Sequence, residues 1–274
     1  MEPFIQYALS KLANIHDTNA LKVFALIFVR LTIIVTLAPF LGGKNAPSPV
    51  KMGLSILLSA LLAPLILAQS APLMTQETLP FLGLLLKEVF IGFAIGFVTS
   101  EIFYVVEMSG QLIDIVRGTN QIQLMVPEIT DRSSAFGNLH YQLMLVLFLA
   151  MNFHVFFFDA LVESFNAVPV HAWPAFTGGS FAFFNEFAVL ISRMFFVAVT
   201  LALPAGVVCL FVDIAFGLLN RVAPQINAYF MSMPVKALGG VLISFAALSM
   251  TFSQFDYYGE RMAKTLVNWI ILFK

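Results

Sequence analysis

The stretch GLLNRVAPQINAYFMSMPVKAL, from Gly217 to Leu238, places a short polar patch between two long apolar runs. Its polar residues and prolines are Asn220, Arg221, Pro224, Gln225, Asn227, Ser232, Pro234 and Lys236. Proline has no backbone N–H and clashes with the preceding helical turn, so the patch predicts a polar turn bent by proline. The flanking runs are then two apolar segments joined by that turn.

The composition shows what kind of chain carries this turn. Its 274 residues are 60% hydrophobic and 11% charged, with a mean hydropathy of +0.92, whereas a soluble domain is roughly 25% charged. We therefore expect an integral, all-α membrane protein. The net charge of −1 offers no field that would attract nucleic acid. The single cysteine, Cys209, cannot form an internal disulfide, and we expect no cleaved signal peptide at the N-terminus.

Six apolar runs are candidates for membrane-spanning helices: Val23–Leu41, Met52–Ala68, Phe81–Val106, Tyr141–Phe158, Phe183–Leu219 and Leu238–Phe255. The fifth would be about 55 Å long as a helix, well beyond a hydrocarbon core of about 30 Å. We expect Pro204 to break it, or the run to leave the membrane. The tail, 256–274, predicts an amphipathic helix at the membrane interface. Residues 1–274 are expected to form one membrane-embedded domain.

The distribution of basic residues does not fit a simple serpentine topology. With six alternating spans, lysines and arginines fall on both sides, and the loops Gln69–Pro80 and Glu163–Ser180 have none. A chain that crosses the bilayer at every run should show a clearer asymmetry. Either the number of spans is wrong, or some apolar runs do not cross a bilayer.

Charges within apolar runs are costly unless they are paired or face water, so they are functional candidates: Arg30, Lys87, Glu88, Asp114, Arg117 and Asp213. For Arg30, a structural ion pair or a cluster of capped carbonyls meets the same physical requirement. Lys87 and Glu88 are adjacent and point to different faces of a helix, so we expect each to need its own partner, in this chain or in another.

Spacing makes further predictions about these charges. Asp213 and Arg221 are eight residues apart, about two helical turns, which puts them on one face if the helix continues. Asp114 and Arg117 are three apart and can pair on a helix. Gly118 follows them and permits a backbone conformation that suits a sharp exit.

Two other patterns concern packing and irregular backbone. Gly92 and Gly96 form a G-x-x-x-G stripe, for which close helix packing is the expected role. The interval Val105–Asn138 is the longest polar stretch, but it is rich in aliphatic residues. A space-filling hairpin and an irregular segment that lines a cavity explain it equally well.

Signatures of enzymes are missing from the sequence. It has no H-E-x-x-H and no G-x-S-x-G motif, and its four histidines lack the spacing of a metal site. We expect no catalysis, cofactor or metal.

Taken together, these segments resemble the FliR/SctT family, the export-gate subunits of flagellar and virulence type III secretion systems. The resemblance rests on FVRLTIIVTLAPFLGGKNAPSPVKMGLSILLSALLAP, KEVFIGFAIGF, GQLIDIVRG, VPEITDRSSAFGNLHYQ and, most specifically, the patch at Gly217–Leu238. The motifs at Ile113–Gly118 and Ser232–Lys236 are closer to the virulence branch, and NAPSPVKMGL is closer to the flagellar branch. The virulence (injectisome) branch is favoured.

The resemblance implies a fold of helical hairpins within a multi-subunit helical assembly in the bacterial inner membrane. Its partners would be SctR/FliP-like, SctS/FliQ-like and SctU/FlhB-like subunits, with unfolded secreted proteins in transit. A plug of the closed pore would correspond by position to Gly118, Thr119, Asn120, Gln121, Ile122, Gln123, Leu124, Met125 and Val126. The polar turn would be solvated inside the assembly, where Gln225 and Asn227 bond the backbone freed at Pro224.

A small-molecule secondary transporter of the inner membrane is the alternative function. No inverted repeat is detectable, and the distribution of basic residues does not fit, which both count against it. An autonomous transporter should be stable when it is expressed alone, whereas a gate subunit should need its partners.

Overall fold

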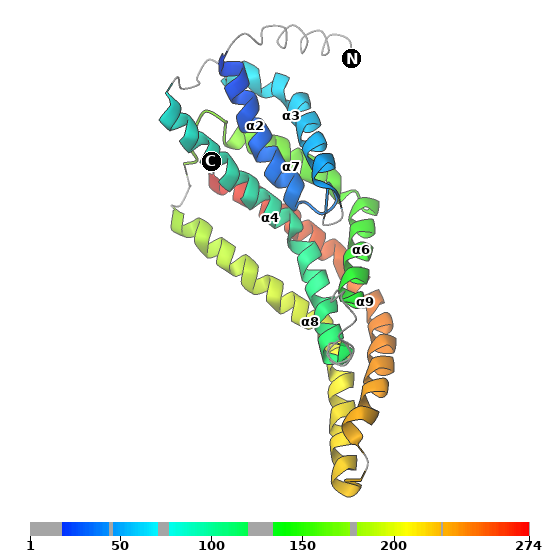
Figure 1. Cartoon of the computed structure of the whole chain (residues 1–274). Helices are drawn as coiled ribbons and strands as arrows, with labels where there is room; N and C mark the ends of the chain where they lie inside the picture. Colours follow the sequence, from blue (N-terminus) through cyan, green and yellow to red (C-terminus); the bar gives the residue numbers. More distant parts are fainter. Residues whose placement is uncertain are drawn as a thin grey trace. The chain divides into compact units, whose positions relative to one another are not determined.

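A computed structural model describes residues 18–43, 46–70, 77–119, 134–175, 180–225 and 227–273. All the regular structure in these residues is helical, so the predicted all-α class is confirmed. Figure 1 shows the helices, which are α2 (Thr18–Leu37), α3 (Ser48–Ser70), α4 (Thr78–Val116), α6 (Ala135–Ala150), α7 (Phe153–Ala167), α8 (Ser180–Val222) and α9 (Ala228–Phe273).

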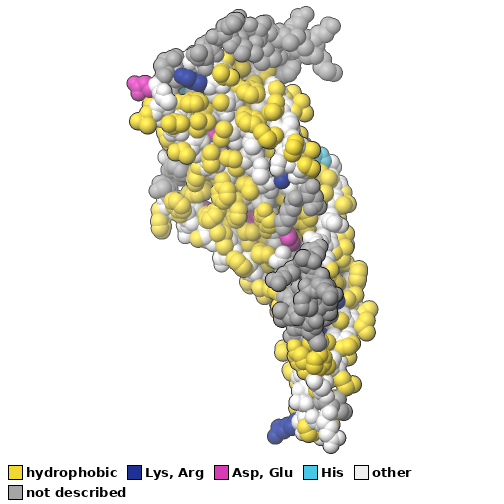
Figure 2. All heavy atoms as spheres, viewed as in Figure 1, with side chains coloured by type: hydrophobic (Ala, Val, Ile, Leu, Met, Phe, Trp, Pro, Cys, Tyr) yellow, Lys and Arg dark blue, Asp and Glu magenta, His cyan; other side chains and the backbone are white. Residues whose placement is uncertain are grey.

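Five of the described helices are long and apolar enough to cross a membrane, and the pair α6 and α7 adds a sixth if it is one broken span. Figure 2 shows hydrophobic side chains over most of the visible face. An exposed surface of this kind is stable in lipid or against other apolar proteins, but not in water. The prediction of a multi-pass membrane protein is therefore confirmed.

The fourth and fifth predicted spans differ from the structure. Tyr141–Phe158 covers parts of two helices, because Asn152 has a left-handed φ of 60° that ends the first helix and precedes the second. The expected break at Pro204 is wrong, since α8 continues for 43 residues with Pro204 inside it. Figure 1 shows α8 bending along its length, which a proline within a helix explains.

The sixth predicted span and the tail form one continuous helix, α9, of 46 residues. The amphipathic pattern of the tail is used for packing, because Met262, Leu266, Trp269 and Phe273 are buried. Trp269 and Phe273 contact Phe183 at the start of α8, with ring centroids 5.0 and 5.4 Å apart. A location at the membrane interface remains a prediction for this segment.

The chain divides into two compact units, and α4, α8 and α9 contribute to both. Unit 1 comprises 1–100, 152–185 and 262–274, and its core includes Leu26, Ile34, Ile91, Phe157, Leu161, Trp269 and Phe273. A Cβ at Gly92 would lie 2.8 Å from the Arg30 carbonyl oxygen, and one at Gly96 would lie 2.9 Å from Leu37. The expected packing role of the G-x-x-x-G stripe is confirmed, with α2 as the partner helix.

Unit 2 comprises 101–151 and 186–261. Its core includes a cluster of Ile113, Phe136, Ala202 and Ala205 from α4, α6 and α8. Gly110 permits close approach of α4 to the start of α6, because a Cβ there would lie 2.5 Å from the backbone of Phe136. The two helices that flank residues 120–133 are thus in direct backbone contact.

Candidate functional site

Arg30 on α2 and Glu88 on α4 form a fully buried ion pair in unit 1. The Nε atom of Arg30 donates to Glu88 Oε2, and Nη2 donates to Oε1 at 3.0 Å. Two parallel hydrogen bonds between a guanidinium and a carboxylate fix both the distance and the orientation of the two side chains. The pair therefore locks α2 to α4 in one register.

The remaining donors of Arg30 reach the C-terminal end of α7. Nη1 donates to the Ser164 carbonyl at 2.9 Å, Nη2 donates to the Val168 carbonyl at 2.9 Å, and the guanidinium lies 4.1 Å from the centroid of the Phe165 ring. Carbonyls at a helix C-terminus lack intrahelical donors and carry partial negative charge. Arg30 thus donates hydrogen bonds to carbonyls at the end of α7 while it pairs with Glu88.

The structure corrects one prediction about Lys87, because this residue pairs with its neighbour in sequence, Glu88. Its Nζ lies 2.7 Å from Glu88 Oε1 and donates to the carbonyls of Pro169, Val170 and Ala172 at 2.9–3.0 Å. The two Cβ atoms do point to different faces, but the long flexible stem of lysine lets its ammonium turn back to the carboxylate. The expectation that Lys87 and Glu88 pair poorly with each other is wrong. Each also has the separate partner that was expected, and both partners lie in this chain: Arg30 on α2 for Glu88, and the carbonyls after α7 for Lys87.

These three charges form one satisfied cluster, made entirely of residues in unit 1. Two cations share one carboxylate, and carbonyls from the end of α7 and the segment after it offset the second positive charge. Breaking a buried pair by removing one partner is far more costly than the net gain from forming it. The geometry supports a structural role for Arg30, Lys87 and Glu88.

Asp114 is the centre of a second cluster, in unit 2. It accepts from Ser134 Oγ at 2.6 Å, from the Phe136 amide at 3.0 Å and from Arg117 at 3.1 Å. Ser134 also accepts from the Gly137 amide and so caps α6. One carboxylate therefore holds the end of α4 and the start of α6 together, and the three-residue spacing predicted its pairing with Arg117.

Arg117 extends this cluster to α9. Its guanidinium lies 4.7 Å from the centroid of the Phe136 ring, and its stem fills the space at Gly240. A Cβ at Gly240 would lie 2.4 Å from Arg117 Cγ, so no larger residue fits there without a shift. Arg117 thus contacts three helices, although nothing in the sequence pattern identifies Gly240 as its neighbour.

The predicted plug lies mostly outside the described residues. Gly118 has a positive φ of 82°, which agrees with the sharp exit expected there, and Thr119 follows it. The other seven candidates, Asn120, Gln121, Ile122, Gln123, Leu124, Met125 and Val126, fall in the range that the structure does not describe. Their role as a plug stays a prediction.

The polar patch is the connection between α8 and α9. It exposes Asn220, Arg221, Pro224, Gln225 and Asn227, while Pro234 and Lys236 belong to α9. Asn227 Oδ1 accepts from the Phe230 amide at 3.4 Å, so it caps α9. The structure thus gives Asn227 a partner three residues further along the chain, where bonding to the backbone near Pro224 was expected.

Asp213 pairs with Lys236 across this hairpin, at 2.8 Å. The Lys236 side chain is 8% exposed and that of Asp213 is 51% exposed. Arg221 was the residue expected on the same face as Asp213, but it is exposed near the turn. The neighbour across the hairpin provides the counter-charge instead, because α8 and α9 run side by side there.

Sequence reasoning did not single out three other charges of unit 2. Glu101 on α4, Arg193 on α8 and Arg261 on α9 interact electrostatically. Arg261 also donates to the Tyr257 hydroxyl at 2.9 Å. Glu101 and Arg193 each lie within a predicted apolar run, and a charge at such a place is the signal that could have suggested this grouping, whereas Arg261 lies in the predicted tail.

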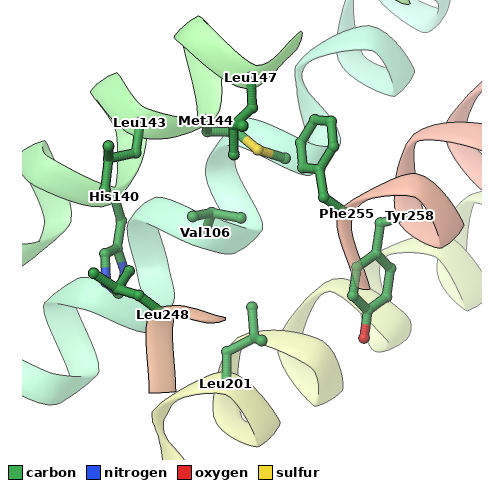
Figure 3. Close-up of a pocket in the computed structure, with 9 residues that line it drawn as sticks. All are labelled: Val106, His140, Leu143, Met144, Leu147, Leu201, Leu248, Phe255 and Tyr258. Atoms are coloured by element: carbon green, nitrogen blue, oxygen red, sulfur yellow. The ribbon is translucent and has the colours of Figure 1, made fainter. Parts of the chain in front are cut away.

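A small apolar pocket also lies within unit 2, among α4, α6, α8 and α9 (Figure 3). Its volume is about 20 Å³, which is room for roughly one water-sized group. His140 lines it and bonds Ser109 Oγ through Nδ1 at 3.2 Å. Ser109 also donates its hydroxyl hydrogen to the Val106 carbonyl, so it links the backbone of α4 to His140 on α6. We assign the pocket no function.

Comparison with known proteins found one matching family and several similar proteins. Residues 21–262 match the family model described as bacterial export proteins, family 1. The secretion system apparatus protein SsaT of Salmonella typhimurium is 31% identical over 219 residues, covering 78% of this chain and 82% of that protein. The flagellar biosynthetic protein FliR of Escherichia coli is 27% identical, covering 81% and 82%. The Yop proteins translocation protein T of Yersinia pestis is 27% identical, covering 65% and 68%.

Proposed function

This chain belongs to the bacterial export proteins of family 1, and from that premise we propose that it helps to form and close a pore for unfolded proteins. It is a multi-pass inner-membrane component of a type III protein export apparatus. The proposal rests on the family match over residues 21–262. This range includes the candidate membrane spans in α3, α4, α8 and the first half of α9, and also the bent pair α6 and α7.

Within the apparatus, the chain works with other export components. The partners that we propose are the SctR/FliP-like, SctS/FliQ-like and SctU/FlhB-like subunits, as the resemblance to the FliR/SctT family implies. We also propose that the chain carries out no chemical step. In support, the buried charges Arg30, Glu88 and Asp114 form hydrogen bonds that join helices, and Lys87 bonds Glu88 and the segment after α7.

We place the chain in the virulence branch of these systems. In support, the identity to the Salmonella secretion apparatus protein is 31%, compared with 27% for the Escherichia coli flagellar protein. A complementation assay tests this assignment. The chain should restore export to an injectisome that lacks its own family member, and restoration of flagellar export alone would reverse the assignment.

The segment Gly118–Val126 is the proposed plug of the closed pore. The described residues on either side support this, because Asp114 bonds both Arg117 and Ser134 and so brings the two ends of the intervening segment together. Gly118 directs the chain away from α4 with its positive φ. A segment that is tethered at both ends can occupy a fixed place.

Deleting Thr119–Leu124 tests the plug. We expect the complex to assemble in normal yield but to conduct ions, with a several-fold rise in conductance across bilayers that contain it. A six-residue deletion of Ala71–Gln76, in another connection between helices, is the matched control and should not leak. A Thr119–Leu124 deletion complex that assembles fully and stays as tight as the parent contradicts the plug assignment.

A further inference from the structure

Helix α3 has a broad exposed face that consists only of apolar residues. From Val50 to Leu65, no exposed position of this helix carries a polar side-chain atom. The large members of the face include Ile56, Leu57, Leu61 and Leu65, which are 49–65% exposed. Since successive residues of a helix turn by about 100°, the exposed positions cover an arc of about 220°. We refer to the exposed positions from Val50 to Leu65 as the outer face of α3.

The buried side of α3 has the opposite character, because its residues are small and two of them are polar. Ser55, Ser59 and Ala63 follow one another at intervals of four residues and are fully buried. The two serine hydroxyls donate to carbonyls of their own helix, at 2.8 and 2.6 Å. In a soluble protein the large apolar side chains face the core, whereas small residues between packed helices are typical of helices in lipid.

The width of the outer face indicates what covers it. A helix that docks on another helix uses an apolar stripe about 100° wide, so one docked helix would leave more than half of this arc uncovered. The uncovered aliphatic side chains would then lie in water, which is unfavourable. Acyl chains are fluid and can surround the whole arc. The face also offers no charge or hydrogen-bonding side chain that would hold a protein partner in one register.

Lysines mark the two ends of the hairpin that α2 and α3 form (Figure 1). Lys51 lies in the first turn of α3, and its stem packs against the turn at Gly42, beside the Val35 carbonyl of α2. Lys22 lies towards the other end of α2, 13 residues before Val35, which separates the two lysines by about 20 Å along the hairpin. Lysine stems extend away from hydrocarbon, so both ammonium groups can reach the interfaces of a core about 30 Å thick.

We propose that the outer face of α3 is in direct contact with the acyl chains of the bilayer. The α2–α3 hairpin then spans the hydrocarbon, with Lys22 and Lys51 at opposite interfaces. The distribution of basic residues leaves open which apolar runs cross a bilayer, and this assignment identifies one helix that does. It does not depend on the proposed pore, because it concerns only how the chain is held in the membrane.

A photo-reactive amino acid at Leu57 tests the contact in the full-length protein, within native membranes that contain the other export components. It should cross-link to phospholipid, which mass spectrometry identifies as an adduct that phospholipase digestion shortens. The same amino acid at Asn220, which is exposed near the polar turn after α8, is the control and should give several-fold less lipid adduct. Cross-linking of position 57 to another protein in place of lipid overturns the proposal.

Nitroxide labels on single cysteines, in a Cys209→Ala background, give an independent readout of depth. Leu57→Cys places a label near the middle of the outer face, and Val50→Cys places one near its end. Dissolved oxygen is concentrated in hydrocarbon, so it should relax the label at position 57 more strongly than the label at position 50. A water-soluble nickel chelate should show the opposite order. A chelate that reaches position 57 as readily as position 50 would show an aqueous surface and overturn the lipid contact.

A charged substitution tests the consequence for membrane insertion. Leu57→Asp puts a carboxylate in hydrocarbon without any clash in the chain, so the amount of protein recovered in membranes should fall several-fold, whereas Leu57→Ala should leave it unchanged. Val222→Asp is the matched control, because Val222 is 85% exposed but lies beside the polar turn. Equal recovery of Leu57→Asp and Val222→Asp would mean that hydrocarbon does not cover the outer face of α3.

Discussion

At the scale of the residue, the buried charges show both the reach and the limit of sequence reasoning. A charge in an apolar run needs a partner, and that requirement correctly predicts that Arg30 is paired. The partner's identity depends on tertiary contacts between residues 58 positions apart, which spacing along one helix does not encode. The pairing of Lys87 with Glu88 was missed for another reason: the two residues are adjacent on one helix, and the helical spacing rule does not account for the reach of a flexible lysine side chain.

Neutralising Glu88 should therefore destabilise unit 1. Glu88→Gln keeps the size of the side chain but leaves Arg30 and Lys87 without a counter-charge in a buried site. We expect a loss of about 3–5 kcal/mol in the free energy of unfolding, measured by denaturation of the detergent-extracted protein. Glu186→Gln, at an exposed position on α8, is the control and should change this free energy by less than about 0.5 kcal/mol. Equal stability of the two variants would mean that the cluster contributes nothing to folding.

A second residue-scale prediction concerns the contact between α2 and α4. Gly92→Ala places a Cβ 2.8 Å from the Arg30 carbonyl oxygen, which is backbone and moves only with its helix. We expect a destabilisation of about 1–3 kcal/mol in the same assay. Gly53→Ala is the control, because a Cβ there meets nothing within 4 Å, and it should be neutral or slightly stabilising. A neutral Gly92→Ala would show that the two helices separate at no cost.

At the scale of the element, the sequence predicts helices well and their limits poorly. Each described helix overlaps a predicted apolar run, because backbone groups in lipid must be satisfied within the segment, but one run covers parts of both α6 and α7. A proline was expected to end α8, but Pro204 bends the helix and the helix continues, as lipid and neighbouring helices permit. Asn152 ends α6 within an apolar run, and no glycine or proline stands there to signal it.

The junction between α4 and α6 gives an element-scale prediction. The Phe136 amide lies in the first turn of α6, where it has no intrahelical acceptor, and Asp114 takes that place. In Asp114→Ala the amides of residues 134–137 should exchange hydrogen about tenfold faster, as expected for loss of a bond to a charged group. Hydrogen exchange read by mass spectrometry checks this, with the exposed Asp159→Ala on α7 as the control. Unchanged protection at 134–137 would remove Asp114 as the tether of the intervening segment.

At the scale of the whole molecule, several candidate membrane spans leave most of their residues exposed within the described chain. The share of each candidate span that is buried is 50% for α4 but only 28% for α8 and 22% for the first half of α9. The sequence predicts apolar spans, but it cannot show which faces they use against protein. We propose that residues of other export components cover those faces and decide where the proposed plug lies.

The low burial of α8 and α9 leads to a prediction about the chain in isolation. Helices in a membrane are stabilised by close packing against other helices, and these two have few buried residues within the described chain, so we expect them to depend on neighbours from other export components. When the protein is expressed without other export components, we expect a lifetime several-fold shorter than in their presence, and heterogeneous oligomers after extraction in mild detergent. Pulse-chase labelling and size-exclusion chromatography measure the two effects.

The Glu88→Gln variant serves as a comparison in the same experiment, because its defect lies within unit 1 and partners should not rescue it. Partner-dependent rescue of the parent alone would locate the missing contacts between chains. A parent chain that is long-lived and monodisperse by itself would instead have the property expected of an autonomous small-molecule transporter. The exposed carboxylate of Asp213 would then have to face a water-filled path through a single chain.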